Sequence, residues 1–195
     1  MKKLLIIGAI VIGAIIVFSS GGDKKPSEAK SDAQVAKAGS QFESFLGYKF
    51  GDKLQMTDKV APSQFGNPDP WEKYYDVVLD KPFEIFTKVA IHTSSDGEMF
   101  YIHLRHDYNK GQSADELDRK LRAMFLKKYG EPSIREMESW HWNFDGGKRS
   151  LHYTCHRMGV DFPNIDITAT ANDLYLKYKQ AHVDNQLKKS DANML

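Results

Sequence analysis

Histidine is the residue with the clearest chemical pattern in this 195-residue chain. Five of the seven histidines fall in stretches where apolar and polar residues alternate, the pattern of a half-buried β-strand. In each stretch the histidine occupies a polar position, so its imidazole points away from the predicted core. These residues are His92, His103, His141, His152 and His156. Imidazoles gathered on one sheet face suit a metal or anion site, or a pH-sensing patch.

His141 and His152 are the pair that the sequence brings closest together. A turn at glycines 146–147 puts them directly opposite on neighbouring strands, and a turn one residue earlier makes the pair diagonal. A metal site needs a third donor, for which His103 or Asp166 is available on the same predicted face. The pattern therefore raises a zinc or copper site at His141, His152 and His103 as an alternative to a polar face that binds no cofactor.

Trp140 and Trp142 lie on the apolar side of one predicted strand, with Phe144. They belong to the core if a helix over 113–129 covers this face. If the helix covers it incompletely, the two tryptophans become candidates for a partner-binding patch.

Signatures of known enzyme classes are absent from the chain: it has no phosphate loop, G-x-S-x-G, H-E-x-x-H or calcium loop. Cys155 is the only cysteine, which excludes an internal disulfide and leaves a buried apolar residue, a reactive thiol or an intermolecular disulfide. Its neighbour His156 points to the opposite face of the strand, so the two do not form a catalytic pair. No catalytic residue is assigned, and an envelope hydrolase stays an alternative.

The N-terminal segment, residues 1–22, predicts export. Lys2 and Lys3 precede a run without polar side chains from Leu4 to Phe18, a length typical of a signal peptide and short for a membrane span. The lysines stay in the cytoplasm, so the chain beyond residue 22 is exported. The sequence leaves open whether this segment is cleaved or remains as an inner-membrane anchor. The small polar residues of 23–40 predict a flexible linker.

Charge gives no argument for nucleic-acid binding. The formal net charge is +1, and it becomes −1 (25 basic against 26 acidic residues) when Lys2 and Lys3 are excluded. A local basic surface is predicted on helix 113–129, which either complements the helix dipole or contacts anionic lipid. Its members are Arg119, Lys120, Arg122, Lys127 and Lys128.

Residues 41–188 predict one α+β domain with a mainly antiparallel sheet, one helix packed on it and a C-terminal helix. Strands are expected near 45–50, at 74–79, from Pro82 to 91, and at 100–105, with a hairpin turn at Asp96-Gly97 that places Ile91 opposite Ile102. Three more strands follow the helix over 113–129, and a last helix runs from Asn172 or Asp173 to about 188. Residues 189–195 are expected to fray.

The layout of residues 113–170 resembles that of many small exported bacterial envelope proteins. A helix ends in Lys128-Tyr129-Gly130-Glu131-Pro132, and a strand led by Trp140 and two more strands follow. In layout this is similar to the helix-then-three-strand unit of outer-membrane assembly lipoproteins and β-lactamase-inhibitor proteins. The chain departs from them because it lacks a lipid-anchor cysteine and a clear second unit. The resemblance implies binding to other proteins.

We therefore expect a non-catalytic interaction module of the bacterial cell envelope, exported or membrane-tethered, with a protein partner. The alternatives are a metal- or small-ligand-binding protein that uses the histidine face, and the envelope hydrolase.

Overall fold

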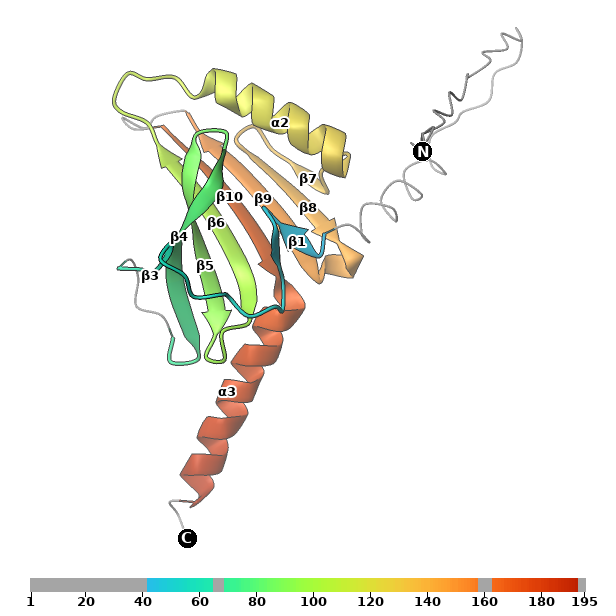
Figure 1. Cartoon of the computed structure of the whole chain (residues 1–195). Coiled ribbons are helices and arrows are strands. Elements are labelled where there is room, and N and C mark those ends of the chain that lie inside the picture. Colours follow the sequence, from blue (N-terminus) through green and yellow to red (C-terminus); the bar gives the residue numbers. More distant parts are fainter. Residues whose placement is uncertain (1–41, 65–68, 158–162, 193–195) are drawn as a thin grey trace, which may run out of the picture.

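The computed structural model describes residues 42–64, 69–157 and 163–192. They form an eight-stranded antiparallel sheet with a helix on one face and a C-terminal helix at one end, which confirms the expected α+β class (Figure 1). The elements are β1 Ser44–Phe45, β2 Tyr48–Lys49, β3 Val60–Pro62, β4 Glu72–Phe83, β5 Phe86–Ser94, β6 Met99–Asp107, α2 Asp115–Tyr129, β7 Ile134–Arg135, β8 Ser139–Phe144, β9 Arg149–His156, β10 Asn164–Ala171 and α3 Asn172–Ala192.

The strand order, β3-β4-β5-β6-β10-β9-β8-β7, divides the sheet into two similar units. In the first, the meander β4–β5–β6 leads into α2, and in the second, the meander β8–β9–β10 leads into α3. The last strands of the two meanders, β6 and β10, pair with each other at the centre. The structure thus contains a second three-strand-and-helix unit that the sequence did not reveal. Both sheet edges are very short strands: β3 has three residues and β7 has two.

Two hairpins have the register expected from their turns. Ile91 pairs with Ile102 across β5 and β6, although a bulge shifts the register after His92. His141 pairs with His152 across β8 and β9, whose connection is a short 3-10 turn at residues 145–147. Because side chains alternate along a strand, these registers put all the alternating histidines on the face opposite the apolar residues.

The sequence suggested that a new strand begins at Pro82, and the structure shows that it does not. Strand β4 continues through it to Phe83, and the turn follows at Glu84, which has a φ of +55°. Proline is tolerated here because β3 pairs only with residues 75–77 of β4, so the edge at Pro82 has no β3 partner. The strand expected near 45–50 is instead a small hairpin of β1 and β2, turning at Leu46 and Gly47.

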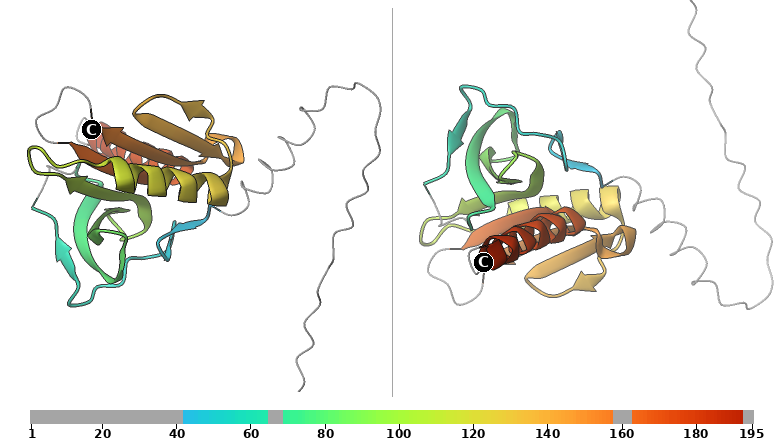
Figure 2. Two further views of the ribbon diagram at one scale, coloured as in Figure 1. Left: turned by 90° about the horizontal axis from the view of Figure 1, so that it is seen from above. Right: turned by 90° about the horizontal axis from the view of Figure 1, so that it is seen from below.

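Helix α2 packs on the apolar face of the second unit. Its buried Leu121, Phe125 and Tyr129 form one stripe, and the Phe125 ring lies 5.8 Å from both Trp142 and Tyr153. Seen from above, α2 lies between the green strands of the first unit and the orange to brown strands of the second (Figure 2). Burial of each large apolar side chain stabilises the fold by roughly 1.5–3 kcal/mol.

The ends of α2 follow local signals in the sequence. The helix begins two residues later than expected: the Asp115 amide donates to the Ser113 hydroxyl at 3.1 Å. It ends at Gly130, whose φ of +77° favours glycine, and the Trp142 indole donates to the Gly130 carbonyl at 2.9 Å. Strand β8 therefore holds the end of the helix.

Helix α3 starts directly after β10 and leaves the sheet. The Asn172 side-chain amide donates to the Gly147 carbonyl at 2.8 Å, and Tyr175 and Tyr178 pack on Phe100. The rest of the helix projects away from the sheet (Figure 1), and its residues from Lys179 onward are exposed except for His182. The helix continues to Ala192, beyond the expected end near 188.

The predicted export segment and linker lie outside the described residues. Among the residues that are described, neither helix has the length and apolar character needed to cross a membrane.

Candidate functional site: the outer face of the sheet

The face opposite α2 carries the chemically active side chains, and it is called the outer face below. The described contacts of α2 and α3 are with residues of the other face, such as Trp142 and Phe100. Strand pairing aligns the outer-face side chains in three rows. The first row is Tyr74, His92, Tyr101, Thr170, Ser150 and Asn143; the second is Asp76, Ala90, His103, Thr168, His152 and His141; the third is Arg105, Asp166, Thr154 and Ser139. These rows define the central outer face.

Composition distinguishes the central outer face from ordinary solvated surface. Its three rows contain no lysine and no glutamate, although Lys88 and Glu72 lie on the same face at their margin. Only Arg105, Asn143 and His152 are exposed, and the other side chains are half-buried or buried by their neighbours. Short or ring-shaped side chains packed on one another lose little conformational freedom when they bind.

His141 and His152 lie side by side, as their register requires. Their ring centroids are 5.4 Å apart and the planes are tilted by 45°. Partial burial and the neighbouring His141 lower the pKa of His152, so its imidazole is neutral over a wider pH range. Two imidazoles at this spacing can bind one metal ion after small rotations of the rings.

His103, the third predicted metal ligand, is not brought to this pair. Thr168 separates it from His152 in the same row, so the two histidines are two strands, or about 10 Å, apart. Its Nε2 lies 2.9 Å from Oδ1 of Asp166. Within the described residues, no three histidine, cysteine or acidic side chains are arranged to hold a metal ion.

Asp166 links His103 to Arg105. Burial acts to raise the pKa of Asp166, but the His103 hydrogen bond and the Arg105 charge, with Nη1 at 3.6 Å, outweigh burial and lower it. The central outer face therefore keeps one ionised, half-buried carboxylate at its centre.

His92 has a different environment, between two tyrosine rings. Its ring lies 3.8 Å from that of Tyr74 and 4.3 Å from that of Tyr101. Burial, with a smaller effect of His103, lowers the pKa of His92 to about 4. This imidazole is neutral at ordinary pH and acts as a rigid part of an aromatic stack.

A groove of about 680 Å³ opens beside this stack. Its floor includes Ala90, whose small side chain lies between Asp76 and His103 in their row. Its walls combine rings, carboxylates and cations, including Tyr74, His92, Lys88, Asp107 and Arg105. The volume is within the range of small-molecule sites, roughly 300–1,000 Å³.

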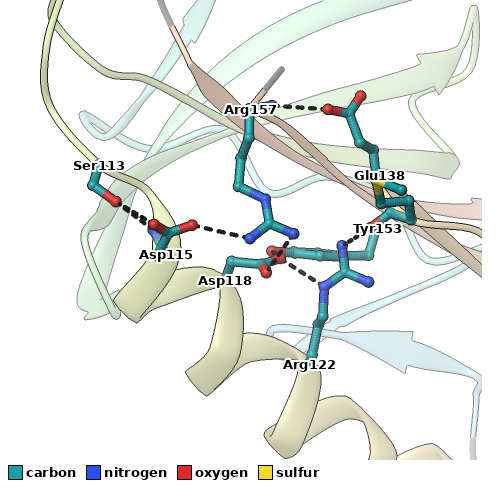
Figure 3. Close-up of polar contacts among 8 residues, drawn as sticks. Ser113, Asp115, Asp118, Arg122, Glu138, Tyr153 and Arg157 are labelled. Atoms are coloured by element: carbon teal, nitrogen blue, oxygen red, sulfur yellow. Dashed lines mark hydrogen bonds and ion pairs between the residues drawn. The ribbon is translucent and has the colours of Figure 1, made fainter.

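A buried polar network joins α2 to the sheet, and the sequence analysis missed it (Figure 3). Asp118 is 4% exposed; it accepts a hydrogen bond from the Tyr153 hydroxyl at 2.5 Å and from Nε of Arg122 at 2.7 Å. Arg157 approaches its other oxygen at 3.5 Å. The available signal was spacing, since Asp118 falls on the same helical stripe as the apolar Leu121.

The network corrects the predicted basic surface of α2. Arg122 turns inward, where its guanidinium lies 4.5 Å from the centre of the Trp140 ring. Lys120 pairs with Glu84 at 2.5 Å. Arg119, Lys127 and Lys128 remain exposed on the helix.

Trp140 and Trp142 are 4% and 2% exposed, because α2 covers them. The two tryptophans would form a partner-binding patch only if the helix covered them incompletely, and it covers them almost fully. Their place is in the core, which was the other interpretation of the pattern.

Cys155 is also buried. Burial, with the charge of Asp118, raises the pKa of its thiol to about 11. A thiol of this kind is neutral at physiological pH, so Cys155 does not supply a nucleophile for the hydrolase alternative.

No protein-family model matches this chain, and neither a curated protein nor a solved structure matches it significantly. The functional argument is therefore made from the central outer face.

Proposed function

We propose that this protein is a non-catalytic interaction module of the cell envelope that binds a protein partner through the central outer face. The observation that carries the proposal is a preorganised sheet face, rich in rings and short polar side chains, on which no described helix packs. Protein interfaces are enriched in tyrosine, which Tyr74 and Tyr101 supply here, and depleted in lysine and glutamate, which the three rows lack. The rows depart from the average interface in having two aspartates and two serines.

Rigidity favours binding through this face. Tyr74, His92 and Tyr101 stack on one another, and Asp166 is held by His103 and Arg105. Ordering a mobile side chain at an interface costs about 0.5–1.5 kcal/mol, and most of that cost is already met here by contacts within the face.

The proposed location is the far side of the inner membrane, by anchor or after cleavage. It is supported by the apolar run from Leu4 to Phe18 behind Lys2 and Lys3. The linker 23–40 gives the domain a reach of about 20–25 Å as a flexible coil.

Site-specific photo-crosslinking in the source cell tests the proposal. A photoreactive residue is placed at Thr168 or His141 on the central outer face, and at Arg119 or Lys127 on α2 as the matched control. We expect a discrete crosslinked envelope protein from the first two positions only. Equal labelling from all four, or none from Thr168 and His141, contradicts the proposal.

Metal or small-ligand binding is the second candidate, favoured by the His141–His152 pair and by the groove at Ala90. Dialysed protein is titrated with zinc and with copper, beside His141→Ala/His152→Ala and a His182→Ala control on α3. Binding that only the double variant loses supports the candidate. Identical weak binding in all three proteins eliminates it.

A further inference from the structure

The projecting part of α3 carries an exposed apolar stripe. Leu176, Val183 and Leu187 are 61%, 42% and 58% exposed. At about 100° per residue, Val183 and Leu187 each lie within about 20° of Leu176, so the three side chains form one narrow line along the helix. We infer that this stripe pairs with the same stripe of a second copy of the chain, with the two helices antiparallel.

The free length of α3 is the first argument. Between Lys179 and Ser190, His182 is the only residue that is not exposed. A helical segment of this length without tertiary contacts is marginal in water, because isolated helices shorter than about 12–15 residues rarely hold. A second helix on the stripe supplies the missing contacts.

The direction of pairing follows from where the domain lies. Tyr175 and Tyr178 tie the first turns of α3 to the sheet, so a parallel pair places two sheet domains against each other. An antiparallel pair places them at opposite ends of the helix pair. Leu176 of one chain then meets Leu187 of the other, and each Val183 lies near the centre.

Charge complementarity supports the same arrangement. Lys177 and Asp184 lie on one flank of the stripe, about 100° and 80° from Leu176. When Leu176 meets Leu187 of the second copy, each Lys177 faces the Asp184 of that copy, which makes two opposite-charge contacts. In a parallel pair this flank of one helix lies beside the opposite flank of the other, so Lys177 and Asp184 of the two copies do not meet.

The contact area between the two helices is small, so self-association is expected to be weak. Residues 176–187 span about 17 Å of helix, and such an interface belongs to the weak class below about 1,200 Å². A common membrane tether raises the effective concentration of the two chains. The inference does not depend on the function of the outer face.

Disulfide trapping of the full chain in detergent micelles tests the geometry, and the buried Cys155 provides a silent background. Leu176→Cys and Leu187→Cys proteins are oxidised alone and as an equimolar mixture. We expect several-fold more crosslinked dimer in the mixture than in either protein alone; a His182→Cys and Lys189→Cys mixture is the off-stripe control. Crosslinking as strong in each single protein, or equal in the control, overturns the inference.

Charge exchange gives a second measurement, by sedimentation of the same chain. Lys177→Asp is expected to weaken self-association several-fold, and Lys177→Asp/Asp184→Lys to restore it. Failure of the double variant to restore it contradicts the pairing. Vesicles that shield the Leu176→Cys and Leu187→Cys thiols from an impermeant maleimide, without crosslinking, assign the stripe to lipid and also overturn the inference.

Discussion

The two units of the sheet have equivalent strands, but the helices attached to them behave differently. After β4–β5–β6, α2 lies down on the sheet, and after β8–β9–β10, α3 departs from it after two turns (Figure 1). The stripe of α2 continues through the buried Leu121, Phe125 and Tyr129, whereas α3 is at most half-buried along its described length, and after Tyr178 only His182 is not exposed. Three strands and a helix therefore do not decide how the helix packs. The length of the apolar stripe that faces the sheet does.

The histidines show a second difference between the units. In the first unit, His92 is enclosed by Tyr74 and Tyr101, and in the second, His152 is exposed beside His141. The His92 ring packs within the sheet face, whereas the His141–His152 pair is accessible to a ligand.

The largest difference in stability between the two helices is expected when one aspartate on each is replaced by alanine. Asp118→Ala is expected to reduce the free energy of unfolding by about 3–5 kcal/mol, because Arg122 and Arg157 lose the buried carboxylate that both contact. Asp184→Ala on α3, where Asp184 bonds the exposed Gln180, is the matched control and is expected to change stability little. Urea unfolding at low protein concentration measures both. Equal costs would break the comparison.

Replacing one leucine on each helix by alanine is expected to give a slightly smaller difference in stability. Leu121→Ala removes a fully buried side chain and is expected to cost about 3 kcal/mol. Leu187→Ala is expected to stay within about 0.5 kcal/mol of the parent protein in the monomer. If thermal and urea unfolding give the two variants the same stability, the comparison of the two helices is wrong.

Acid sensitivity is expected to distinguish the enclosed His92 from a histidine on the projecting part of α3. The folded pKa of His92, about 4, is below its unfolded value near 6.5, so the unfolded chain takes up the proton first and stability is lost as pH falls from 6.5 to 4. Between pH 7 and 4.5 this residue is expected to remove about 2–3 kcal/mol. His92→Phe should abolish that part of the loss, and His182→Phe should not. Denaturant unfolding at both pH values measures it.

The smallest expected effect comes from removing the projecting end of α3. A chain that stops after Gln180 retains Tyr175 and Tyr178 and is expected to lose less than about 1 kcal/mol, while its self-association disappears. Circular dichroism and sedimentation measure the two effects. A collapse of the fold would show that the end of α3 supports the sheet.

Strands and hairpins were predictable because their signals are local. The glycines at 146–147 aligned His141 with His152, as the structure confirms. Ile91 also pairs with Ile102, but the turn there closes one residue earlier than Asp96-Gly97, with the Gly97 amide donating to the Ser94 carbonyl, and the bulge after His92 restores the expected register. The placement of these histidines away from the core followed from alternation alone.

Contacts between distant residues were not predictable. The sequence shows that His103 shares a face with His152, but the β6–β10 pairing, which puts Thr168 between them, depends on the order of strands. The Asp118–Tyr153 hydrogen bond joins a helix to a strand 35 residues away, and no local pattern encodes it. The metal site and the protein partner remain predictions.

The short edge strands have a consequence at high protein concentration. Proteins displayed side by side risk joining sheets edge to edge into fibres. Here one edge strand has three residues and ends in Pro62 and the other has two, and the part of β4 that extends past β3 is interrupted by Pro82, so each edge gives a neighbour only a short stretch of backbone on which to continue the sheet. Copies of this domain can therefore be packed densely without polymerising through their strands.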